Sequence, residues 1–307
     1  MVTTRHLPAF FTLVLGLAVG SVSADDFAWK FKKGEQYEFS VRQSMTQTVP
    51  TPQGAIDTKI DMELIGGWDI TDVGSGGDME ISQRIKRMAM KIKAPGPTPE
   101  IVIDSDKLGE LKGPVAQRIG SSLGKLKKLE FIKTITPLGK VVKAELKHAD
   151  AVAGLPGLTP EAIKEMSADL LLEFPAGSLE TGRTWEKTQT QKLPNVGAME
   201  IVTKYKYVGS EKVNDRELAK FEINGTIKAG GAAKNGANQP KVNGTVEGVL
   251  YFDRAAGRVS HGTTAAEMKI PTTVLGQSIV IKMKVESATE LGPVPSEKET
   301  LQSQGSP

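Results

Sequence analysis

Apolar and polar residues alternate with a period of two along most of this 307-residue chain, and no other feature constrains its fold as strongly. Between Ile56 and Leu64 the even positions carry apolar residues or Thr, and the odd positions carry charges. The same alternation recurs between Ile279 and Val285. Such a pattern is typical of antiparallel sheets with one buried face. It predicts a mainly β fold with two short helical segments: a strongly curved antiparallel sheet, or half-open barrel, of about ten strands.

The alternation changes phase within one of the expected strands. Ile81 and Ile85 stand at odd positions, whereas Met88 and Met90 stand at even positions. One extra residue near Arg87 would return both pairs to the same face, so the sequence predicts a β-bulge there.

Short turn sequences separate the alternating runs, which is typical of hairpins. They lie at 33–35, 137–140, 213–216 and 253–257.

Two segments have apolar residues at intervals of three and four, as helices do. The first, 106–127, contains several glycines and Pro114, which we expect to break it into two pieces. The second, 160–172, follows Thr159, a good N-cap, and begins with Pro160 at the first helical position.

The residues before Asp25 are typical of a secretory signal peptide. Arg5 supplies the positive charge, residues 7–19 form the apolar core, and Val22 and Ala24 fit the small-residue cleavage pattern. Residues 1–24 are therefore expected to direct export, to the periplasm or the extracellular space. No later segment is long and apolar enough to span a bilayer.

The remaining chain is expected to form a single β-rich domain over 25–291, followed by a disordered tail over 292–307. Its halves, about 27–148 and 174–291, each open with a glycine and an aromatic residue three positions later, Gly34 and Tyr37 in one case and Gly182 and Trp185 in the other. Duplication of a half and chance similarity between turns both explain this match.

Composition excludes several classes of function. The chain contains no Cys, which removes disulfides and thiolate chemistry. Its net charge of +3 is small for a protein that neutralises nucleic-acid phosphates. Neither His148 nor His261 belongs to a His-x-x-x-His or Glu-x-x-His pattern, the spacings typical of zinc ligands. We therefore expect no nucleic-acid partner, no metal, no cofactor and no catalytic residues.

Three motifs carry a resemblance to a known family. They are Trp29-Lys30-Phe31-Lys32-Lys33-Gly34, Gly182-Arg183-Thr184-Trp185, and Tyr251-Phe252-Asp253-Arg254 with Gly257-Arg258. Over about 27–291 the chain resembles an exported bacterial family that is a domain of unknown function. That family brings no catalytic residues. One departure is Asn214-Asp215, where relatives have Asp-Gly, and it suggests a different turn type.

The expected architecture is also similar to the periplasmic lipoprotein-carrier (LolA-like) fold, an unclosed barrel of about eleven strands with helices over its concave face. This similarity concerns architecture only, and fold does not fix function.

Methionine is unusually frequent at apolar positions of the expected strands. It is flexible and polarizable, so it suits a surface that adapts to varied apolar partners, although it also fills ordinary cores. The candidate ligand-lining residues are Ile60, Met62, Met88, Met90, Ile281 and Met283.

Three functions remain open from the sequence. The first is a non-catalytic envelope protein that holds a lipid, a lipoprotein or another apolar ligand inside the curved sheet, with 106–127 and 160–172 as covers. The second is a structural module with a solid core that binds envelope proteins. The third is a hydrolase, which nothing in the sequence supports with a matched nucleophile and base.

Overall fold

The computed structural model describes residues 27–97, 99–152, 171–193, 197–230, 242–274 and 277–294. Twelve strands form one antiparallel sheet. Their bounds are β1 (Gln36–Thr51), β2 (Gly54–Val73), β3 (Met79–Lys93), β4 (Ile101–Asp104), β5 (Glu130–Ile135), β6 (Val141–Lys147), β7 (Thr184–Leu193), β8 (Gly197–Val213), β9 (Arg216–Ala229), β10 (Asn243–Asp253), β11 (Arg258–Val274) and β12 (Gln277–Pro293).

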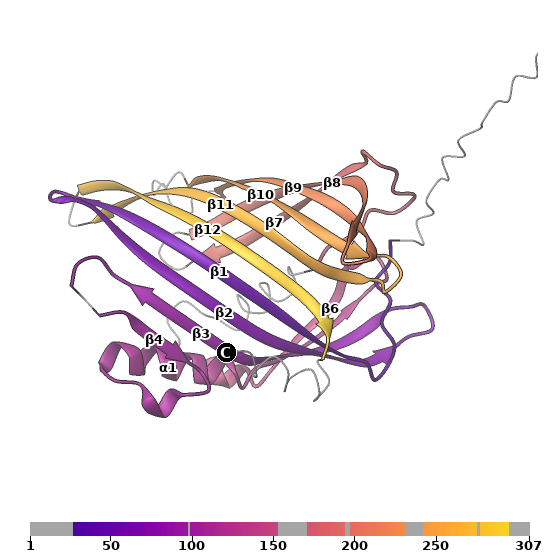
Figure 1. Ribbon diagram of the computed structural model, residues 1–307, viewed down its shortest axis with the longest axis horizontal. Coiled ribbons are helices and arrows are strands. Elements are labelled where there is room, and N and C mark those ends of the chain that lie inside the picture. The colour runs from indigo at the N-terminus through magenta and orange to yellow at the C-terminus, as the bar shows by residue number, and fades with distance from the viewer. Residues whose placement is uncertain are drawn as a thin grey trace, which may run out of the picture.

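The strand order is β6-β5-β3-β2-β1-β12-β11-β10-β9-β8-β7. The N-terminal half of β3 pairs with β5, and its C-terminal half pairs with β4. The two halves of the chain therefore meet where β1 pairs with β12 (Figure 1). In the described part of the chain β6 and β7 are free edges that do not pair with each other. This confirms the mainly β, curved and unclosed antiparallel sheet, with twelve strands instead of about ten.

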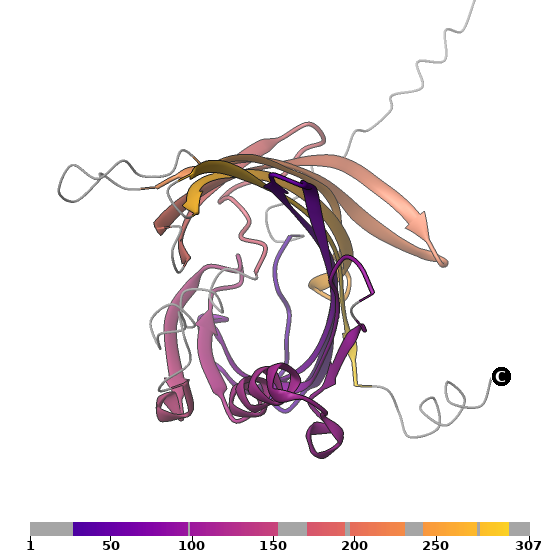
Figure 2. The ribbon, with the colours of Figure 1, turned by 90° about the vertical axis from the view of Figure 1, so that its left-hand side faces the viewer.

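A bulge lies at the predicted place. Ile65 pairs with Arg87 and Gly66 pairs with Ile85, so Lys86 is the extra residue. Next to it the ring of Phe39 crosses over Gly66, where an added Cβ would lie 2.1 Å from Phe39 Cζ. Bulges and glycines of this kind bend a sheet strongly. Figure 2 shows the result, with β8–β11 crossing above a wall formed by β1–β3.

An aromatic core fills one end of the hollow side of the sheet. Phe27, Trp29 and Phe31 lie on a short segment before β1 and are almost fully buried. Trp29 N–H donates to Pro137 O (2.7 Å) and Lys30 N–H donates to Gly257 O (2.9 Å), so the segment is held between two hairpin turns. We call residues 27–31 the strap.

The two glycine turns of the halves share their geometry. Gly34 and Gly182 have φ of +88° and +92°, a region that favours glycine. Gly34 N–H donates to Ile70 O, and Gly182 N–H donates to Tyr207 O. The duplication itself stays a prediction. The turn at 33–35 does not join two strands, because residues 27–32 are not a strand; the expectation of a hairpin there is wrong.

The other three turn segments do connect strand pairs, β5–β6, β8–β9 and β10–β11. Asn214 and Asp215 both have positive φ, +47° and +61°. Positive φ at both central positions is typical of a type I′ turn, which Asn and Asp tolerate. The difference from relatives stays a prediction.

The first helical segment is broken at Pro114 as predicted. A short 3-10 turn, η2 (Leu108–Glu110), precedes the helix α1 (Pro114–Leu126). Of the predicted helix at 160–172, residues 160–170 lie outside the described residues, while Leu171 and Leu172 are buried and not helical. No described helix is long and apolar enough to cross a membrane.

The predicted domain boundaries stay a prediction. The signal segment 1–24 and most of the tail lie outside the described residues. Strand β12 continues through Pro293, two residues past the expected end of the domain at 291.

Candidate functional site

Four of the six candidate residues lie together on the hollow side of the sheet. Met62 pairs directly with Met90, and the adjacent pairs are Ile60 with Ile92 and Leu64 with Met88. Side chains two residues apart on a strand share a face, so these three rows form one apolar patch across β2 and β3.

Helix α1 covers part of this patch. Met88, Ile103, Ala116 and Leu123 pack into a cluster against which Met62 also lies. Met88 is 8% exposed, whereas Ile60, Met62 and Met90 remain partly exposed. The patch is thus incompletely covered.

The other two candidates belong to a second patch. Met283 pairs with Met268, and Ile281 pairs with Ile270. Both Ile281 and Met283 are partly buried against a cluster that includes Ile270. Strand β1 runs between the two patches, and the structure does not bring all six residues into direct contact.

A groove of about 1160 Å³ lies along the sheet, and its lining includes Met62 and Met90 of the apolar patch. It crosses eight strands, β9 to β12 and β1 to β4, and is lined by three consecutive rows of the strand register. One of these rows consists of Glu222, Val249, Thr263, Ala288, Arg42, Glu63, Ala89 and Asp104.

The floor and rim of the groove differ in character. Ala89, Ala265 and Ala288 are small and leave room above the strands. Most of its carboxylates have basic partners, for example Glu286 with Lys284 (3.1 Å). Paired charges around a floor of small side chains suit an extended, neutral partner better than a free ion.

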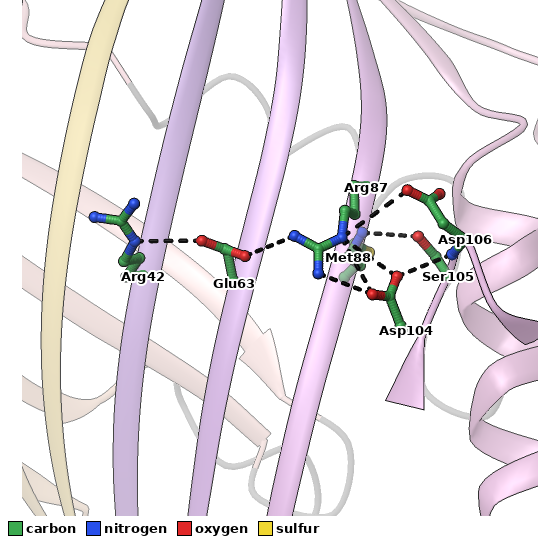
Figure 3. A network of polar contacts seen from close by, with 7 residues as sticks. All are labelled: Arg42, Glu63, Arg87, Met88, Asp104, Ser105 and Asp106. Carbon is green, nitrogen blue, oxygen red and sulfur yellow. Dashed lines mark hydrogen bonds and ion pairs between the residues drawn. The ribbon is translucent and has the colours of Figure 1, made fainter. Parts of the chain in front are cut away.

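Arg87, in the bulge region, organises one wall of this groove (Figure 3). Its guanidinium contacts Glu63 (2.9 Å) and Asp104 (2.8 Å), and Glu63 also accepts from Arg42 (3.3 Å). The hydrogen bond from Arg87, together with nearby positive charge, lowers the pKa of Asp104 below its usual range, although burial opposes this.

Asp104, Ser105 and Asp106 lie just before η2 but do not cap it with their side chains. Neither η2 nor α1 has a side-chain cap. Ser105 Oγ instead accepts from Met88 N–H (2.9 Å), and Asp106 pairs with Lys127 (2.6 Å) just after α1. These contacts tie α1 to the strands.

Replacing Arg87 by Gln is expected to lower the free energy of unfolding by about 1 kcal/mol at neutral pH, a modest value because solvent screens this partly exposed group. The pKa of Asp104 is lowered in the fold, so its contribution is present at neutral pH and is lost as pH falls through that pKa. Urea unfolding should show the difference at pH 7 and little of it at about pH 2.

The control is Arg42→Gln, since Arg42 is 64% exposed and makes one contact with Glu63. It should leave stability nearly unchanged. An equal loss for Arg87→Gln at both pH values would show that packing, and not the ion pair with Asp104, causes the effect.

One buried charge was not foreseen from the sequence. Lys133 lies in β5 between Phe131 and Ile135 at an apolar position of the alternation and is 1% exposed. Its Nζ donates to Gln83 Oε1 (2.8 Å) and lies 4.6 Å from the ring centre of Trp68. Among the described residues no carboxylate pairs with it, and burial lowers its pKa to about 7.

His148 and His261 lie in or next to different strands of the sheet. His148 follows β6 with φ of +56°, and His261 in β11 stacks on Tyr251 at 4.5 Å. In the described part of the chain, no group of three or more His, Asp or Glu side chains could hold a metal ion.

Comparisons with known proteins show the fold. No family model and no curated protein matches the chain. The fold is similar to lipovitellin, in a structure concerned with its lipid–protein interactions, with a TM-score of 0.50 and 11% identity. The match covers 87% of this chain and 26% of that one, so the chain spans about a quarter of the lipovitellin chain.

Two further solved structures are similar to a much smaller extent. One is a domain described as outer membrane lipoprotein-sorting from Vibrio parahaemolyticus (TM-score 0.12, 10% identity, 87% of this chain and 90% of that one). The other is a DUF1329 family protein from Desulfovibrio piger (TM-score 0.14, 9% identity, 84% of each chain). TM-scores this low carry no argument about function.

Proposed function

We propose that this chain is a non-catalytic binding protein of the cell envelope that holds the acyl part of a lipid, or another apolar ligand, on the hollow side of its sheet. The observation that carries the proposal is the apolar patch around Met62 and Met90, which continues beyond the aromatic core and stays partly exposed. Buried cores are normally filled by close packing, so apolar side chains left partly exposed on a concave face indicate a binding surface.

The physical driving force would be burial of apolar surface. At roughly 25 cal/mol per Å², or about 0.8 kcal/mol per CH₂ group, an acyl chain gains several kcal/mol without any polar contact. Methionine suits this role because its unbranched side chain adapts to chains of different length.

The envelope location follows from the expected signal peptide. The fold shared with lipovitellin supports a sheet of the right shape, while the ligand rests on the patch alone. The absence of a matched nucleophile and base in the sequence supports a non-catalytic role.

A titration with a fluorescent fatty acid tests the proposal, and the register supplies a matched pair of variants. Met62 pairs with Met90 on the hollow side, whereas the neighbouring pair Asp61 and Lys91 points to the other face of the sheet. Met62→Gln with Met90→Gln should weaken binding about tenfold, because two polar amides replace apolar contacts. Asp61→Asn with Lys91→Gln should leave binding unchanged.

Saturable binding by the wild-type protein, lost selectively with the methionine pair, supports the proposal. No saturable binding would refute it. An equal loss with both pairs would place the ligand elsewhere.

The groove favours a second candidate function, an interaction module that binds a segment of another envelope protein. Its volume is about 1160 Å³, and its lining includes small residues such as Ala265 and Ala288. This function predicts that Ala288→Trp, which fills the floor, abolishes recovery of a stoichiometric partner from envelope extracts while leaving fatty-acid binding unchanged.

A further inference from the structure

We propose that the outer surface of α1 and its flanking residues docks on an anionic lipid surface. This inference stands on charge and exposure and does not depend on what the apolar patch binds.

The segment from 105 to 128 concentrates positive charge. It holds two acidic residues, Asp106 and Glu110, and six basic ones, so its net charge is +4, larger than the +3 of the whole chain. The basic residues are Lys107, Lys112, Arg118, Lys125, Lys127 and Lys128. Clusters of this kind on a helix are typical of attachment to anionic lipid.

The helix directs its charge away from the sheet. Ala116, Gly120 and Leu123 are its buried residues. At about 100° per residue, Arg118 and Lys125 lie on the opposite side of the helix. Arg118 is exposed and Lys125 is partly exposed, so both can reach a flat surface.

These charges are not neutralised within the described structure. Lys127 pairs with Asp106, but Arg118, Lys125 and Lys128 form no ion pair with any other described residue. Unpaired basic side chains gain about 1 kcal/mol each near an anionic bilayer, about a fivefold effect on partitioning per residue.

An exposed apolar residue accompanies the basic stripe. Val115, in the first turn of α1, is 54% exposed. A helix that lies in a membrane interface combines basic residues with apolar side chains that enter the headgroup region. The buried side of α1 covers Met88, so such docking would bring the apolar patch close to the lipid.

Co-sedimentation with vesicles tests this proposal with the full chain. The protein should bind vesicles of equal parts phosphatidylglycerol and phosphatidylcholine and not vesicles of phosphatidylcholine alone, and added salt should weaken the binding. Arg118→Gln, Lys125→Gln and Lys128→Gln together should reduce partitioning about a hundredfold.

The matched control removes three exposed lysines from β8, β9 and β11 instead, with Lys204→Gln, Lys228→Gln and Lys269→Gln. It should retain most of the binding. No binding to anionic vesicles, equal binding to neutral vesicles, or equal losses in both triple variants would each overturn the proposal. Binding only to an acidic protein would do so as well. The Met62→Gln and Met90→Gln variant should still bind vesicles, which separates this test from that of the ligand.

Discussion

Replacing Trp29 by Ala is expected to lower the free energy of unfolding by about 3–5 kcal/mol. The indole of Trp29 packs against Phe31, Trp68 and Phe252 in the aromatic core. Its Nε1–H donates to Leu172 O (3.0 Å), which links the strap to the residues just before β7. Truncation would leave both a cavity and an unpaired buried carbonyl.

The expected loss is a large part of the total stability, because small and medium domains are stable by only about 5–15 kcal/mol and this chain has no disulfides. Urea unfolding followed by circular dichroism measures it without relying on Trp fluorescence. Trp29→Phe should lose less stability than Trp29→Ala, because a ring still fills most of the space. The lost hydrogen bond to Leu172 O should account for about 1 kcal/mol of its cost.

Val142→Ala is the control, since Val142 is 53% exposed and should have almost no effect. If Trp29→Ala proved as mild as that control, the strap would not stabilise this end of the sheet.

Replacing Lys133 by Met is expected to stabilise the protein at pH 7 by about 1–4 kcal/mol, because an apolar side chain of similar length avoids the cost of burying a charge. The face of Trp68 and the oxygen of Gln83 offset only part of that cost. Gln83 would keep its hydrogen bond from Trp68 Nε1–H (3.0 Å) in the variant.

The sign of the pH dependence follows from the lowered pKa. Burial brings the pKa of Lys133 from 10.5 to about 7 in the folded protein. Between these values the unfolded chain binds a proton that the folded chain does not, so stability of the wild type rises with pH across this window. Lys133→Met lacks this rise, and its advantage should shrink as pH approaches about 10.5.

Urea unfolding at several pH values from 6 to 10 checks both parts of this expectation. Lys140→Met is the control, because Lys140 is exposed in the next turn and should show neither the gain nor the changed slope. Destabilisation of Lys133→Met at pH 7, or a slope identical to that of the wild type, would mean that a charge is accommodated at this position.

The alternation predicted the sheet because side chains on a strand alternate between its faces whatever their partner is. The same rule located the bulge, since Ile85 and Met88 can share a face only if one residue between them is unpaired. Three of the four predicted hairpin turns were correct, because turn residues favour a turn through their own backbone preferences and do not depend on distant contacts. The turn at Gly34 differed because the strap is fixed by contacts with distant residues.

Features that depend on pairing between distant segments could not be predicted. The pairing of β1 with β12 brings residues about 240 positions apart into register, as with Arg42 and Ala288. The groove is built from rows that cross eight strands in this way, so no local pattern indicates it. The division of the candidate residues into two patches has the same cause.

Lys133 did leave a signal. It occupies an apolar position between Phe131 and Ile135, and a charge there implies either an exposed strand face or a buried charged group. The motif resemblance to an exported family stays a prediction, whereas the unclosed, curved sheet with a helix on its hollow side agrees with the LolA-like architecture expected from the pattern.

The most direct test of the proposed ligand is native mass spectrometry of the protein purified from its own host. A bound lipid should appear as a discrete mass above that of the polypeptide, and it should be absent from the Met62→Gln and Met90→Gln variant prepared in the same way. The polypeptide mass alone, with the apolar patch intact, would contradict the proposal that this sheet carries a lipid.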